Sequence, residues 1–159
     1  MSLSKKFEKL KNQTKTNTNT RTVEIAGVKF KLGTLTVEED IFFRTQLGGI
    51  SEEAGLASML TTRMIILALA IKGIDDYSFE GVPPEGMIDV GDQNPDGTPK
   101  KHERYTYLWK NLSTLDEILI EKLFEHLAAL IEKTEKNITS LIKYDIRDTP
   151  ELPDLKDAG

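Results

Sequence analysis

A run of eight apolar residues, "MIILALAI" at positions 64–71, constrains the fold more than any other feature of the sequence. It forms the second half of a segment that begins at Ser51, followed by Glu52 and Glu53, and ends before Gly73. A serine followed by acidic residues is typical of a helix start, because the hydroxyl caps free N–H groups and carboxylates favour the positive end of the helix dipole. We therefore predict a helix that is apolar on nearly every side. It must be buried, either in the core of the domain or in the groove of a partner.

Two further signals precede this segment. Residues 22–32 alternate polar and apolar side chains around Ala26 and Gly27, which predicts two half-buried strands joined by a tight turn. Thr36 is followed three residues later by Glu39, and this pair has the spacing of a capping box. We expect a helix to begin there and to end near Gly48.

Two helices are predicted in the second half of the chain. One begins near Glu103, and a second capping box formed by Thr114 and Glu117 opens a long helix that continues to about Lys136. Residues 138–159 contain two prolines and a net negative charge, so they are predicted to form an irregular acidic tail.

These elements predict a mainly α protein with a small N-terminal β-hairpin, which belongs to the α+β class. We expect a compact helical domain with flexible N- and C-terminal tails. The 159 residues suit one domain. We assign residues 1–21 to a basic flexible arm and residues 22–137 to a single domain of hairpin and helices. Residues 75–101 form a Pro/Gly-rich insertion within that domain, and residues 138–159 form the tail.

Charge is distributed unevenly along the chain. Residues 1–21 carry six basic side chains and one acidic one, a net charge of +5, so the rest must carry −10 to give the total of −5. Within this arm Leu3, Phe7 and Leu10 recur at helical spacing, which predicts a short amphipathic helix that docks on another surface. Nucleic-acid binding is the weaker reading of the charge, because Phe7 is the only aromatic residue of the arm and no recognition motif accompanies it.

The sequence "DQNPDGTPKKHE", residues 92–103, satisfies the pattern of an EF-hand calcium loop. Its oxygen ligands would come from Asp92, Asn94, Asp96 and Glu103. The preceding residues 81–91 contain two prolines and three glycines and cannot form the incoming helix that this site needs. "NPDG" is also a favourable type I turn, so we predict a turn that closes a hairpin with a bulge rather than a metal site.

Catalytic chemistry finds little support in the sequence. There is no cysteine, so thiolate catalysis and disulfides are excluded, and His102 and His126 have no companions at metal-ligand spacing. Phosphate-binding and dinucleotide-binding loops are absent, as is a nucleophile elbow. The longest apolar run is far shorter than the roughly 20 residues of a membrane-spanning helix. We expect a protein that acts by binding, with no enzymatic activity, cofactor or membrane span.

One family resemblance adds to this reading. "VEIAGVKFKLGTLTVEED", with Leu35, Thr36, Glu38 and Glu39, resembles the opening of tailed-phage tail-assembly chaperones and baseplate-hub assembly proteins. The later "YLWKNLSTLDEILIEKLFEHLAALIEK" is similar to their closing helices, so the resemblance spans residues 22–136. It implies a non-enzymatic role in building a phage tail or baseplate. The insertion at 75–101 and the basic arm depart from the family pattern.

The resemblance implies that the partners are other phage tail or baseplate proteins, with a homo-oligomer or multi-copy assembly as a further possibility. We expect the protein in the host cytoplasm during assembly, or retained in the virion tail or baseplate. The predicted partner-binding residues are Leu3, Phe7, Leu10, Met64, Ile65 and Leu69. The alternative is a regulatory module stabilised by a divalent cation, or one that binds nucleic acid.

Overall fold

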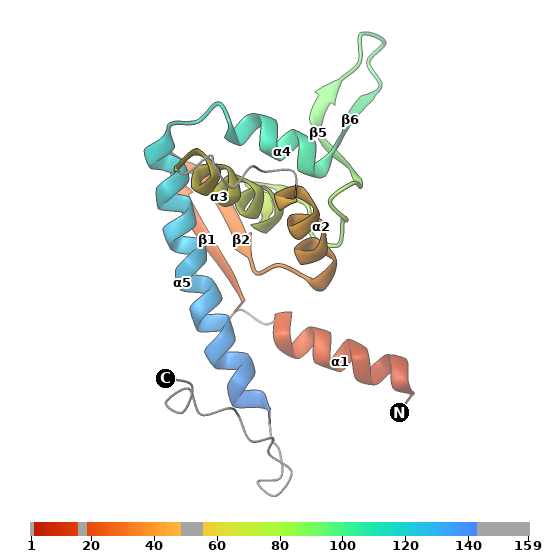
Figure 1. Ribbon diagram of the computed structural model, residues 1–159. Helices are drawn as coiled ribbons and strands as arrows, with labels where there is room; N and C mark the ends of the chain where they lie inside the picture. The colour runs from red at the N-terminus through yellow and green to blue at the C-terminus, as the bar shows by residue number, and fades with distance from the viewer. Residues whose placement is uncertain (1, 16–18, 49–55, 143–159) are drawn as a thin grey trace, which may run out of the picture.

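The computed structural model describes residues 2–15, 19–48 and 56–142. In these residues the chain forms five helices and six strands (Figure 1). The helices are α1 (Leu3–Lys15), α2 (Val37–Leu47), α3 (Leu56–Ala70), α4 (Arg104–Leu112) and α5 (Glu117–Leu141). The strands are β1 (Thr20–Ile25), β2 (Val28–Gly33), β3 (Ile71–Ile74), β4 (Tyr77–Ser78), β5 (Met87–Gln93) and β6 (Pro99–Glu103). None of the described helices is both long and apolar enough to cross a membrane.

The predicted N-terminal hairpin is confirmed. Strands β1 and β2 pair antiparallel from Thr20 opposite Gly33 to Ile25 opposite Val28. The turn between them has positive φ angles at Ala26 (51°) and Gly27 (82°), as the right-handed twist of a two-residue hairpin requires. Thr20 and Arg21 therefore belong to the sheet, although the sequence assigned them to the flexible arm.

The fold class predicted from the sequence is wrong, because the hairpin is only half of a larger sheet. Strand β3 pairs antiparallel with β2, and β4 pairs with β3, which gives a four-stranded sheet in the order β1-β2-β3-β4. Strands β5 and β6 form a second, two-stranded sheet. The described residues therefore form an α+β fold in which the sheets are major elements.

The helix predicted from residue 51 to Gly73 is too long at its C-terminal end. Helix α3 ends at Ala70, and the next four residues form β3, in which Ile71 pairs with Leu32 of β2. The apolar run is thus shared between a helix and a strand. Both elements are buried, and a fully apolar run carries no periodicity that could mark the boundary between them. Ser51, the predicted start of this helix, lies outside the described residues.

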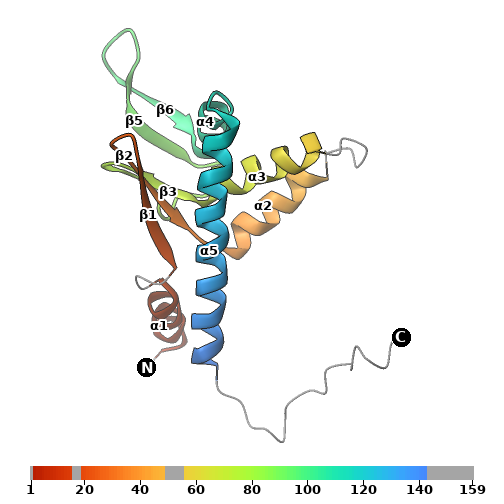
Figure 2. The ribbon, with the colours of Figure 1, turned by 90° about the vertical axis from the view of Figure 1, so that its left-hand side faces the viewer.

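Helices α3 and α5 cover one face of the four-stranded sheet, and α2 and α4 pack on α3 (Figures 1 and 2). The hydrophobic core lies between these layers. It includes Leu32 of β2, Leu67 of α3 and Leu123 of α5, each with no exposed surface. Of the two ways to bury the apolar run that the sequence allowed, the structure shows the first, burial in the core of the domain.

The segment 75–101, assigned to an insertion, contributes to the body of the fold. Phe79 and Ile88 are 2% and 5% exposed and belong to the hydrophobic core. The predicted turn at residues 94–97 is confirmed: the Gly97 N–H donates to the Asn94 carbonyl at 2.9 Å, and Gly97 has a φ of 85°. It closes the β5–β6 hairpin, which extends from the body near α4 (Figure 1).

Of the predicted helix starts in the described residues, two are confirmed and one is wrong. Helix α4 begins at Arg104, directly after Glu103, as predicted. Thr36 and Glu39 form both hydrogen bonds of a capping box at the start of α2. Thr114 does not cap α5, because its hydroxyl donates to the Asn111 carbonyl, and Asp116 accepts from the Ile118 N–H instead. Helix α5 also continues to Leu141, so residues 138–141 are helical and do not belong to an irregular tail. Residues 143–159 lie outside the described residues.

Candidate functional site

The amphipathic helix predicted in the arm is present as α1, and its apolar side chains are exposed. Leu3, Phe7 and Leu10 keep 69%, 64% and 59% of their surface accessible. They lie at steps of four and three residues, so they share one face of the helix. Phenylalanine and leucine side chains exposed together on one helix face are typical of a surface that binds another protein.

The other three predicted partner-binding residues are not available to a partner. Met64, Ile65 and Leu69 are 6%, 3% and 0% exposed in α3. The prediction that they bind a partner is therefore wrong for this fold. Its physical reason is that the sheet and the neighbouring helices already cover α3 on the sides that carry these residues.

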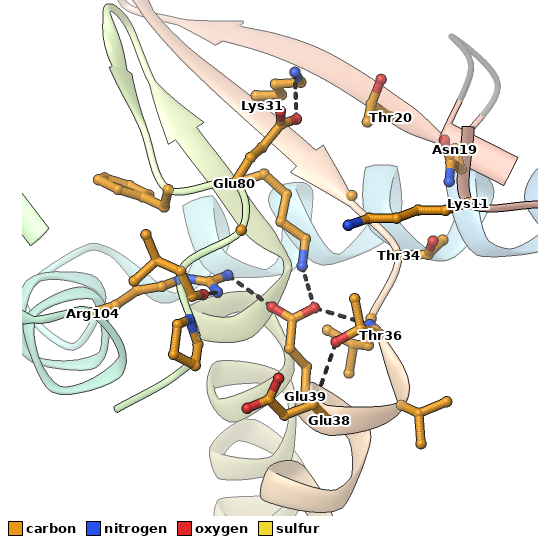
Figure 3. Close-up of a pocket in the computed structure, with 18 of the residues that line it drawn as sticks. Lys11, Asn19, Thr20, Lys31, Thr34, Thr36, Glu38, Glu39, Glu80 and Arg104 are labelled. Carbon is orange, nitrogen blue, oxygen red and sulfur yellow. Dashed lines mark hydrogen bonds and ion pairs between the residues drawn. The ribbon is translucent and has the colours of Figure 1, made fainter. Parts of the chain in front are cut away.

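A cavity of about 840 Å³ lies beside the C-terminal half of α1 (Figure 3). The start of α2, the loop 79–83 and the first residue of α4 also line it. Its charged lining residues are the cations Lys11, Lys31, Lys72 and Arg104 and the carboxylates Glu38, Glu39 and Glu80.

Glu39 is the centre of the charged cluster at this cavity. It is 4% exposed, and its Oε1 accepts the Thr36 backbone N–H at 2.9 Å and an ion pair from the Lys72 ammonium. Its Oε2 pairs with the Nη2 of Arg104 at 2.9 Å. One carboxylate thus joins α2, β3 and α4, which lie far apart in the sequence (Figure 3).

Arg104 is 2% exposed and makes three contacts with its two terminal nitrogens. Besides Glu39, Nη1 donates to the Val82 carbonyl at 2.6 Å and Nη2 donates to the Leu69 carbonyl at 2.8 Å. Its Nε is buried without a hydrogen-bond partner among the described residues. Arg104 therefore fixes the loop before β5 and the end of α3 to the start of α4.

The charges and hydrogen bonds around Glu39 favour its ionised form. Burial alone would raise the pKa of Glu39, but the charge and hydrogen bond of Lys72, the Thr36 N–H and the charge of Arg104 together hold it below its ordinary value. At the rim, Lys31 pairs with Glu80 at 2.6 Å. The Glu39 cluster and the Lys31–Glu80 pair both join opposite charges within the chain. The cluster therefore acts chiefly to position elements of the fold.

Sequence reasoning missed Lys72 and Arg104. Their partner Glu39 was identified, but only as a capping residue. The cluster joins positions 33 and 65 residues from Glu39, and a single sequence carries no signal of such pairing. The one usable hint is that Lys72 interrupts an otherwise apolar stretch.

The four residues of the calcium-loop pattern lie on the β5–β6 hairpin, and each makes a local hydrogen bond. Asp92 contacts His102 at 2.8 Å, Asn94 and Asp96 bond to Thr98, and Glu103 accepts from Thr106. A strand, β5, precedes the loop where an EF-hand has a helix. His126 is half-buried on α5. In the described part of the chain, no three His, Cys, Asp or Glu side chains are grouped as a metal would need.

We expect millimolar calcium to leave the melting temperature of the protein unchanged. Each of the four side chains already makes a local hydrogen bond, and a strand takes the place of the incoming helix, whereas a site of micromolar affinity would add several kcal/mol by mass action. The check is a thermal melt with calcium and with chelator. A clear rise that Asp96→Ala abolishes would show that residues 92–103 bind the ion.

A scan against protein-family models, a search of curated proteins and a search of solved structures each found no match to this chain.

Proposed function

We propose that this protein is a non-enzymatic component of bacteriophage tail or baseplate assembly, and that it acts by binding other virion subunits through α1. The observation that carries the proposal is the exposed apolar face of α1, formed by Leu3, Phe7 and Leu10. An isolated helix of this length is marginally stable in water, so an uncovered apolar face favours a helix that completes its packing on another chain.

The charges of α1 indicate what kind of surface the bound subunit has. Lys6 and Lys11 flank the apolar face, Lys5 and Lys9 lie on the remaining surface of the helix, and Glu8 is the one acidic residue of the helix. An apolar surface with an acidic rim would match this face in both hydrophobicity and charge. The resemblance of residues 22–136 to tail-assembly chaperones and baseplate-hub assembly proteins names phage tail and baseplate proteins as the class in which to look.

The cavity supports the proposal less well than α1 does. Its buried cations already have a carboxylate partner, and its only fully buried acid, Glu39, is held ionised by three donors. No nucleophile is paired with a general base at this site among the described lining residues. We therefore assign the function to the surface of α1. Binding of a subunit there is compatible with assembly in the host cytoplasm and with retention in the particle.

Of the two family roles, we favour a structural bridge that stays in the tail or baseplate. Helix α1 extends away from the body, where it can contact a neighbour while the body contacts another (Figure 1). Quantitative mass spectrometry of purified virions distinguishes the roles. A bridge is present in fixed copy number, whereas an assembly chaperone is found only with unassembled subunits.

Phe7→Asp is expected to weaken binding to the tail or baseplate subunit at least tenfold while leaving the body of the protein folded. A buried aromatic anchor commonly carries a large share of binding energy, and Phe7 lies outside the folded core. The measurement is co-purification after co-expression with the tail and baseplate proteins of the same phage, followed by titration of the purified pair.

The matched control is Asn12→Asp, which makes the same change of charge on the opposite, exposed face of α1. It should bind like the unaltered protein. If neither co-expression nor titration detects binding to any tail or baseplate protein, the proposed function is wrong.

A further inference from the structure

A second uncovered apolar face lies at the C-terminal end of α5. The last buried side chains of this helix are Leu130 and Thr134. Around and beyond them Ile131, Ile138 and Ile142 are 42%, 37% and 59% exposed, at steps of seven and four residues that place them on one face. Leu141, 53% exposed, lies next to that face. The end of α5 therefore has an apolar stripe that its own domain leaves open.

The stripes of α1 and α5 lie at the same end of the molecule. Both views show α1 and the last turns of α5 at the end opposite the β5–β6 hairpin (Figures 1 and 2). Lys11 of α1 and Ile138 of α5 line the same cavity. Within one chain, however, the two stripes do not cover each other, because the side chains of both remain exposed.

The charges beside the two stripes are complementary. Lys6 lies three residues after Leu3 and four before Leu10, so it flanks the stripe of α1. Glu135 lies four residues after Ile131 and three before Ile138, so it flanks the stripe of α5 in the same way. Within the described residues neither Lys6 nor Glu135 forms an ion pair.

We propose that α1 of one copy packs on the end of α5 of a second copy, with Leu3, Phe7 and Leu10 against Ile131, Ile138 and Ile142. Each copy has one stripe of each kind, so a two-fold pair satisfies all four stripes in a closed dimer. The heptad-like steps on both helices suit ridges-into-grooves packing, and Lys6 then faces Glu135. The inference rests on the proposed function for α1 as the binding helix and names a copy of this chain as the first subunit that α1 contacts, so that the other virion subunits bind to the dimer.

The first test is self-association of the isolated full-length protein. Sedimentation equilibrium over a range of concentrations should give a mass twice the 17.9 kDa of the chain. Phe7→Asp and Ile131→Asp should each raise the dissociation constant at least tenfold, because each places a carboxylate in an apolar contact.

Matched controls lie on the opposite face of the same two helices. Asn12→Asp in α1 and Ala129→Asp in α5 make the same change of charge at exposed positions and should leave the dissociation constant within about twofold. A mixture of Phe7→Asp with Ile131→Asp should associate more strongly than either variant alone, since the mixed pair retains one intact contact.

A covalent trap keeps the test valid if Ile131→Asp fails to fold. The chain has no cysteine, so Phe7→Cys and Ile138→Cys each introduce a single thiol. When the two proteins are mixed and oxidised, a disulfide should join the two different variants, because such a bond forms only between Cα atoms about 4.4–6.8 Å apart. Crosslinking confined to Phe7→Cys alone would mean that α1 pairs with α1 and would overturn the inference.

The outcomes separate this inference from the proposed function. A protein that stays monomeric at all concentrations, yet binds a tail or baseplate protein through Phe7, overturns the dimer and leaves the proposed function standing. A dimer with the predicted disulfide that binds no tail or baseplate protein supports the dimer and overturns the proposed function.

Discussion

Replacement of Glu39 with alanine is expected to lower the free energy of unfolding by about 3–5 kcal/mol. The change leaves Lys72 and Arg104 without their carboxylate in a largely buried site, and removal of one partner from a buried ion cluster leaves uncompensated charge. It also removes the reciprocal bond of the capping box at the start of α2. Urea unfolding followed by circular dichroism measures the loss.

Two companion variants separate the contributions. Glu38→Ala changes an exposed acid in the same helical turn and should alter stability by less than about 0.5 kcal/mol. Glu39→Gln retains an oxygen that can accept the Thr36 N–H. The free energy of unfolding lost in this variant therefore measures the ion pairs without the cap. A loss below about 1 kcal/mol for Glu39→Ala would show that solvent compensates Lys72 and Arg104, and that the cluster does not hold the fold together.

Replacement of Phe79 with alanine should destabilise the protein by about 3–5 kcal/mol, the usual cost of emptying a buried phenylalanine site. Phe79 is 2% exposed and packs in the hydrophobic core, although it lies in the segment that the sequence assigned to an insertion. At about 2–4 °C per kcal/mol, the melting temperature should fall by roughly 6–20 °C.

Tyr77→Ala provides the comparison for Phe79→Ala. Tyr77 is an aromatic residue two positions away on β4, but it is 45% exposed, so its removal should cost less than about 1 kcal/mol. Equal effects of the two substitutions would contradict the assignment of Phe79 to the core.

Local signals in the sequence predicted local structure well. The hairpin at residues 20–33, the capping box of Thr36 and Glu39, and the turn at residues 94–97 depend on interactions between residues at most a few positions apart, or on adjacent strands. Their side-chain chemistry is specific enough to be recognised without tertiary information. The apolar stripe of α1 was predicted for the same reason, because helical spacing is a local property.

Interactions that depend on distant residues were not predictable. Strand β3 exists because Ile71 pairs with Leu32 across two intervening helices, and nothing within the run 64–71 marks where the helix ends. The partner-binding assignment of Met64, Ile65 and Leu69 failed on the same point, since their exposure depends on which elements cover α3. The sequence predicted Thr114 as the cap of α5, whereas the backbone geometry makes Asp116 the cap.

The double role of Glu39 fixes the position of α2 in two respects at once. A shift of the helix along its axis, or a rotation about it, would break the cap at Thr36 and the ion pairs with β3 and α4 in the same step. The cap and the ion pairs together therefore fix the axial position and the rotation of the start of α2 relative to the sheet. The contacts of Glu39 therefore also set the position of the outer face of α2, where Val37 and Ile41 are 78% and 61% exposed.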